Sequence, residues 1–136
     1  MTDTKLNIID NDLCLMSNGD EGVIRCHKPF SKIAEFRKVA PNCIIVREDT
    51  DNYDDNKSNI YCLDDNFKIV WFSDQPFDKD TFPNQIVWDK EINDNGTSWL
   101  DYLVDNINAM TCSSWKGITV SIAYKTGKVI KTLFTK

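Results

Sequence analysis

The tripeptide Thr126-Gly127-Lys128, near the end of the chain, combines a glycine with a lysine, as phosphate-binding loops do. A phosphate loop, however, needs a longer glycine-rich turn that leads into a helix, whose free N–H groups hold the anion. Here one glycine stands alone, and Lys128 is followed by Val-Ile-Lys-Thr-Leu-Phe, a run typical of a β-strand. We therefore predict a β-hairpin with Gly127 at positive φ in its corner, where other residues are strained by about 1 kcal/mol or more.

The single histidine and the five cysteines are the other residues that could support catalysis or bind a metal. Cys26 and His27 are adjacent, but successive side chains of a strand point to opposite faces, so these two cannot form a dyad. A cysteine from elsewhere in the chain, folded against His27, is the remaining route to nucleophilic catalysis. A zinc site needs paired ligands at short spacing, and the sequence has no C-x-x-C pair. We expect no catalytic residues, no metal and no cofactor, and hence a protein that is not an enzyme.

The five cysteines, at positions 14, 26, 43, 62 and 112, have apolar neighbours. An odd count without paired spacing predicts reduced, mostly buried thiols in a cytosolic protein. No run approaches the roughly 18 apolar residues of a membrane helix, and the polar start lacks the apolar stretch of a secretory signal. We therefore expect a cytoplasmic protein that does not bind membranes.

The polar segment 47–58 gathers carboxylates around one aromatic residue, Tyr53. Calcium binding by an EF-hand requires glycine at the sixth loop position and glutamate at the twelfth, and no register of this segment offers both. One interpretation is a solvated connecting loop. The other is a contact loop for a protein partner, because aromatic residues beside charges are typical of interfaces.

A second segment, 72–83, places two phenylalanines among aspartates and between prolines. Phe77 and Phe82 are either loop anchors tucked into the core or exposed anchors for a partner. Trp115, before the last hairpin, is interpreted as structural, with its indole covering a sheet. The two loops together supply the predicted partner-binding residues, which are Glu48, Asp49, Asp51, Tyr53, Asp54, Asp55, Asp74, Phe77, Asp78 and Asp80.

Charge is distributed unevenly along the chain, whose net charge is −5. All 21 acidic residues precede position 106, whereas 106–136 contains five lysines and no acid. Residues 1–105 therefore hold 11 basic against 21 acidic residues, a balance of −10, and the tail carries +5. An acidic body repels nucleic acid and favours a basic partner, although a surplus of acids also serves solubility.

Short apolar runs separated by turn clusters predict the elements that position these loops. Strands are expected at 13–16, 23–26, 42–47, 59–63, 68–72, 85–88, 120–123 and 129–134. Segment 31–39 has apolar residues at helical spacing, so a short helix and an irregular edge strand both remain open. Segment 98–110 fits either one helix or two strands, and the strands would complete a C-terminal four-stranded meander. We predict one domain, residues 1–136, that is mainly β and antiparallel, a sandwich or strongly curved sheet with at most one or two short helices.

Two hairpins, 63–70 and 123–130, share a pattern at a constant offset of 60 residues. Segments 59–71 and 115–134 resemble the hairpins of propeller-type repeats, in which a strand ends in Asp, a Gly-Lys turn follows, and the next strand carries apolar residues and Trp. Phe67 replaces the usual glycine in the first copy, and Tyr124 replaces the usual aspartate in the second. Asn66 is expected to make the first turn, since asparagine tolerates the left-handed region.

Over residues 42–136 the chain resembles short bacterial β proteins that look like immunity proteins of contact-dependent inhibition and polymorphic toxin systems. This resemblance implies a non-catalytic protein that binds over the active site of a cognate toxin, as a monomer in a 1:1 complex. A nuclease is the expected toxin, because a nuclease presents a positive cleft to its polyanionic substrate and acidic loops can mimic the phosphates. The alternative is a small structural or scaffolding β module without a toxin partner.

Overall fold

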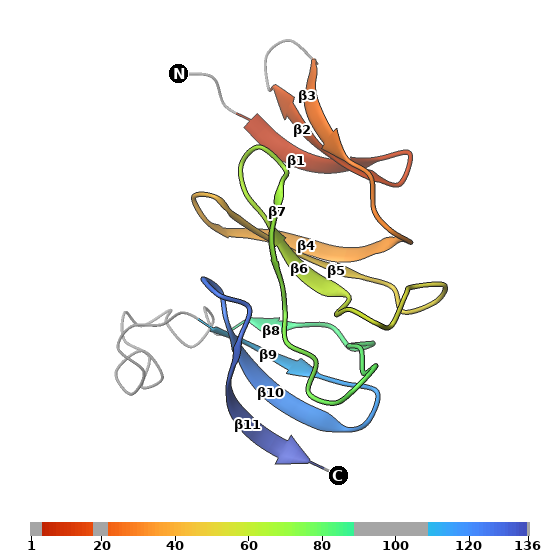
Figure 1. Ribbon diagram of the computed structural model, residues 1–136. Helices are drawn as coiled ribbons and strands as arrows, with labels where there is room; N and C mark the ends of the chain where they lie inside the picture. The colour runs from red at the N-terminus through yellow and green to blue at the C-terminus, as the bar shows by residue number, and fades with distance from the viewer. Residues whose placement is uncertain (1–3, 18–21, 89–108, 136) are drawn as a thin grey trace.

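Eleven strands form three antiparallel sheets in the residues that the computed structural model describes, which are 4–17, 22–88 and 109–135. The first sheet contains β1 (Thr4–Ile9), β2 (Asp12–Ser17) and β3 (Val23–His27). The second contains β4 (Ile33–Ala40), β5 (Cys43–Glu48), β6 (Ile60–Leu63) and β7 (Ile69–Phe72). The third contains β8 (Val87–Trp88), β9 (Ala109–Ser113), β10 (Ile118–Ala123) and β11 (Val129–Thr135). The sheets follow one another along the chain and lie in a stack (Figure 1).

The second sheet lies in the middle of the stack, and its central strands are buried on both faces. Side chains alternate between the faces of a strand, so β5 and β6 each contribute to two cores. The core against the first sheet comprises Leu13, Ile44, Val46, Tyr61 and Leu63. The core against the third sheet includes Ile45, Ile60, Cys62, Met110, Cys112, Val120 and Ile122. Burial of one such aliphatic side chain contributes about 1.5–3 kcal/mol, and burial on both faces explains why these strands are continuous apolar runs.

The mainly-β, antiparallel fold predicted from the sequence is confirmed, and every predicted strand is present. The described residues contain no helix, and so none that could cross a membrane. Segment 31–39 contributes β4, which pairs with β5 across a turn at Asn42 (φ 61°), so the short helix is wrong. Ile33 and Phe36, the residues at helical spacing, both pack against the core between the first and second sheets. The choice between helix and strands at 98–110 lies outside the described residues except for its last two, which begin β9.

The two hairpins at an offset of 60 residues share a backbone feature. Gly127 has φ 72° and Phe67, the residue 60 positions earlier, has φ 64°. The prediction for Gly127 is therefore confirmed, whereas Phe67 and not Asn66 occupies the left-handed region in the first hairpin. The hairpins also touch, because the Trp71 indole nitrogen donates a hydrogen bond to the carbonyl oxygen of Tyr124 at 3.1 Å. A Cβ atom on Gly127 would lie 2.3 Å from the Trp71 ring, so close packing as well as φ requires glycine here.

The expectation of five reduced cysteines is wrong for Cys14 and Cys26, which form a disulfide. They are direct partners in the register of β2 and β3, with Cα atoms 4.1 Å apart, and this pairing cannot be read from spacing alone. Cys43, Cys62 and Cys112 are buried and form no disulfide, as predicted.

Candidate partner-binding face

The two acidic loops predicted from the sequence lie next to each other. The first joins β5 to β6 and the second joins β7 to β8, and Figure 1 shows both on the same side of the stack as the β9–β10 turn. Gln75 links them, because its side-chain nitrogen donates to the carbonyl oxygens of Asp55 (2.8 Å) and Asp80 (2.9 Å). The fold thus brings together two segments about 25 residues apart in the sequence.

Buried polar side chains fix the shape of both loops. The Asn59 side chain is fully buried and donates to the carbonyl oxygens of Glu48 (2.6 Å) and Phe82 (2.8 Å). Its amide oxygen accepts a hydrogen bond from the Phe82 N–H at 2.8 Å. Tyr53 is also buried, and its hydroxyl donates to the Ser58 carbonyl oxygen at 2.7 Å. These contacts satisfy backbone groups that would otherwise be unpaired inside the protein, and they hold the loops in one arrangement.

Glu48, predicted as a partner contact, is fully buried between the first and second sheets and cannot touch a partner in this structure. Its carboxylate accepts hydrogen bonds from the N–H groups of Phe30 (3.1 Å) and Ser31 (2.6 Å) and from the Tyr61 hydroxyl. The sequence did not indicate this role, since its donors come from the distant β3–β4 connection and from β6. Glu48 instead stabilises the fold by binding the segment that precedes β4 to the second sheet.

His27 extends the same network, with its Nε2 atom 2.6 Å from the Tyr61 hydroxyl oxygen. Because the Tyr61 proton is donated to Glu48, His27 must donate at Nε2. Burial lowers the pKa of His27, while the charges of Glu48 and Asp12 oppose that shift. Burial and the hydrogen bond to Glu48 raise the pKa of Tyr61. The histidine that sequence reasoning considered for catalysis thus pairs with a tyrosine and joins the first sheet to the second.

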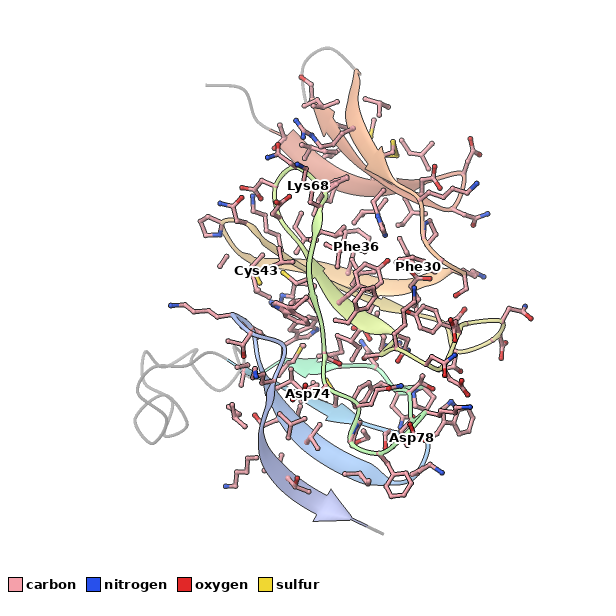
Figure 2. All side chains as sticks on the ribbon, viewed as in Figure 1. Phe30, Phe36, Cys43, Lys68, Asp74 and Asp78 are labelled. Carbon is pink, nitrogen blue, oxygen red and sulfur yellow. A yellow bond between two sulfur atoms is a disulfide. The ribbon has the colours of Figure 1, made fainter. Side chains whose placement is uncertain are left out.

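The remaining predicted residues differ in exposure. Asp80 is 1% exposed, and one of its oxygens accepts a hydrogen bond from the Lys116 N–H at 3.2 Å. Asp74 is exposed, but its carboxylate accepts from the Val129 N–H at 3.0 Å and so caps the start of β11. Figure 2 shows Asp74 near the middle of the view and Asp78 out on the loop at lower right. Asp49 is half-buried, and the other exposed carboxylates are those of Asp51, Asp54, Asp55 and Asp78.

Two large aromatic side chains are exposed beside these carboxylates. Phe77 is 57% exposed, while Phe82 is fully buried, so one of the two phenylalanines anchors the loop and the other faces solvent. Trp115 is 64% exposed, so the interpretation that it covers a sheet is wrong. The backbone N–H of Trp115 donates to the Thr81 carbonyl oxygen at 2.9 Å, which places the β9–β10 turn against the second acidic loop. The polar neighbours of Trp115, Ser113-Ser114 and Lys116-Gly117, are the sequence signal that could have indicated an exposed turn.

We refer to the exposed residues Asp51, Asp54, Asp55, Phe77, Asp78 and Trp115 as the loop face. A groove of about 540 Å³ lies within it, between the first acidic loop and the β9–β10 turn. Its lining residues are Thr50, Asp51, Tyr53, Asp55, Lys79, Asp80, Thr81, Trp115 and Lys116. Exposed aromatic rings beside carboxylates can bind a surface that combines apolar and cationic groups.

The described residues contain no group of three or more histidine, cysteine or acidic side chains that could hold a metal ion. Comparisons with protein-family models, with curated proteins and with solved structures find no match to this chain.

Proposed function

We propose that this chain is a non-catalytic binding protein whose loop face binds a basic protein partner. The observation that carries the proposal is the gathering, on one face, of four exposed aspartates with two exposed aromatic side chains. Large apolar side chains that are exposed together on a soluble protein commonly belong to interaction sites. Tryptophan is the residue type most enriched among those that contribute most to binding energy.

The proposed partner is a cognate toxin domain, which makes the chain an immunity protein. The resemblance of residues 42–136 to short bacterial β proteins that look like immunity proteins supports this assignment. Charge supports it as well, because a nuclease presents a positive cleft to nucleic acid, and exposed aspartates would be attracted to that cleft. Binding over the cleft would exclude the substrate, so inhibition would require no catalysis by the immunity protein.

A protection assay tests the immunity function directly. A candidate toxin domain, taken from a reading frame next to the gene, is expressed in a sensitive strain, alone and together with this chain. We expect growth only in the presence of the chain, and a purified 1:1 complex. If an active toxin domain kills cells equally well in both cases and forms no complex, the immunity function is wrong, and the scaffolding alternative gains support.

Substitutions test the loop face as the contact surface. In the D51N/D55N/D78N variant we expect slower association with the toxin domain and a weaker dependence on salt, since three attractive charges are lost. The control is D10N/D12N/D65N, which changes the net charge equally but lies outside the loop face. Trp115→Ala is expected to weaken binding about tenfold or more, mostly through faster dissociation. If the test and control triple variants change the association rate equally and Trp115→Ala does not change the dissociation rate, the contact surface is not the loop face.

A further inference from the structure

Asp80 has an unusual environment for a carboxylate. It is 1% exposed, and its Oδ1 atom accepts the Lys116 N–H at 3.2 Å. Its Oδ2 atom is buried and has no hydrogen-bond partner among the residues that the structure describes. A buried charged oxygen without a donor costs free energy, because it has lost its water and gained nothing in return. An unsatisfied buried group of this kind requires an explanation, and a ligand that supplies the missing donor is one.

Asp80 is one of the residues that line the groove of the loop face. The other lining residues include Asp51 and Asp55, which are acidic, and Tyr53 and Trp115, which are aromatic. Two lysines also line the groove, but the ammonium group of Lys116 lies 5.0 Å from the centre of the Phe77 ring and is directed toward that ring. The groove therefore combines excess negative charge, an exposed indole and one carboxylate oxygen that lacks a donor.

We propose that this groove receives an arginine side chain of the protein partner, with its guanidinium group donating to Asp80 and stacking on Trp115. The inference rests on the proposed function and names the chemical group that the partner presents. Guanidinium is planar, always charged and weakly hydrated, so it can hydrogen-bond a buried carboxylate and lie on an aromatic ring at once. Lysine has a compact ammonium group without a stacking plane and fits this combination less well.

Because Asp80 Oδ2 is buried in the unbound protein, the proposed contact requires that a side chain over it change rotamer. The long exposed side chains in the lining are those of Lys79, Trp115 and Lys116. Exposed side chains change rotamer within nanoseconds, so this step does not limit binding.

Titration of the ¹⁵N-labelled chain with Nα-acetyl-arginine amide tests the proposal without the toxin. The Lys116 amide reports on the site, because its N–H is bonded to Asp80. We expect a saturable shift of this resonance, a weaker shift with Nα-acetyl-lysine amide, and none with Nα-acetyl-citrulline amide, the neutral analogue of the same shape. Asp80→Asn keeps an acceptor for the Lys116 N–H and is expected to weaken arginine binding about tenfold or more. Asp10→Asn, an equal charge change outside the groove, is the control and should leave the titration unchanged.

Equal shifts with arginine and citrulline, or an unchanged titration of the Asp80→Asn variant, would overturn the proposal. Thermal unfolding provides a second test. Because Asp80→Asn removes the buried charge, the variant is expected to unfold at a higher temperature than the natural chain. A lower unfolding temperature would mean that Oδ2 serves the fold, and this too would overturn the arginine site. The protection assay tests the proposed function separately. If the chain protects cells but does not bind the arginine derivative, only the proposed arginine site is refuted.

Discussion

Gly127→Ala is expected to destabilise the protein strongly, although the residues on either side of it, Thr126 and Lys128, are exposed. The backbone contribution comes from φ 72°, a left-handed conformation that costs a residue with a Cβ atom about 1–2 kcal/mol. Alanine also restricts the unfolded chain, which returns about 0.4–1 kcal/mol. These two backbone effects together leave a net cost on the order of 1 kcal/mol.

Packing against Trp71 accounts for the larger part of the expected loss in the free energy of unfolding. The alanine Cβ would lie 2.3 and 2.5 Å from two carbons of the indole, whereas favourable carbon contacts occur at about 3.5–4.0 Å. The ring must therefore shift by more than about 1 Å, at an overpacking cost of about 1–3 kcal/mol. This shift also strains the 3.1 Å hydrogen bond from Trp71 to the Tyr124 carbonyl oxygen, which contributes about 1 kcal/mol. The expected total loss is about 3 kcal/mol in the free energy of unfolding.

Urea unfolding followed by tryptophan fluorescence measures this loss. Gly22→Ala is the matched control, because an added Cβ atom there meets nothing within 4 Å, and its effect should stay within about 0.5 kcal/mol. In a Trp71→Leu background, the clash disappears and Gly127→Ala should cost only the backbone contribution. Equal costs in both backgrounds would refute the packing argument, and a neutral Gly127→Ala variant would refute the whole account.

Three further predictions concern the first sheet and its attachment. Tyr61→Phe should lower the free energy of unfolding by about 1–3 kcal/mol, because the buried Glu48 carboxylate loses a donor and His27 loses its acceptor. Chemical denaturation measures this change, and a smaller effect would mean that the network contributes little to stability. In the folded protein the pKa of His27 is lower than its ordinary value of 6.5. As the pH falls, the unfolded chain therefore takes up a proton before the folded protein does. The free energy of unfolding should decrease below about pH 6.5 and be regained above it. Urea midpoints at about pH 5.5 and 7.5 should show this slope, and His27→Gln should reduce it; equal slopes would assign the effect to other groups. Replacing Cys14 and Cys26 together by serine should cost about 3 kcal/mol, since the cross-link spans 12 residues, and a stability equal to that of the natural chain under oxidising conditions would contradict this.

Local patterns of the sequence were sufficient to predict most strands. The run in β5 is rich in β-branched residues and that in β6 contains Ile60 and Tyr61, which also favour strands; both runs are buried on both faces, so propensity and burial agree. In β4 the two apolar residues at helical spacing face the same core, which is equally compatible with a strand that contains register shifts. Only the pairing with β5 distinguishes these possibilities, and pairing is a long-range property.

The candidate site was predicted in part. The exposure of Asp51, Asp54, Asp55 and Asp78 could be expected from the sequence, since carboxylates in polar segments usually remain in water. The burial of Glu48 could not be predicted, because its donors, Ser31 and Tyr61, are brought to it by the folding of separate strands. The exposure of Trp115 was missed for the opposite reason. Large aromatic residues are usually buried, and a turn that holds one out to solvent is evident only in three dimensions.

The number of acidic residues overstates the electrostatic attraction that the loop face can exert. Glu48, Asp74 and Asp80 use their oxygens to accept backbone N–H groups, so they act first on the fold. The exposed aspartates are interspersed with lysines, among them Lys57, which lies over the Phe30 ring at 3.6 Å. Steering by such a mixed surface is modest, and interactions beyond about 8 Å are screened at physiological salt. Binding energy must then come mainly from the aromatic anchors and the groove. We therefore expect Trp115→Ala to change the dissociation rate more than D51N/D55N/D78N changes the association rate, and the reverse order would mean that charge contributes most to binding.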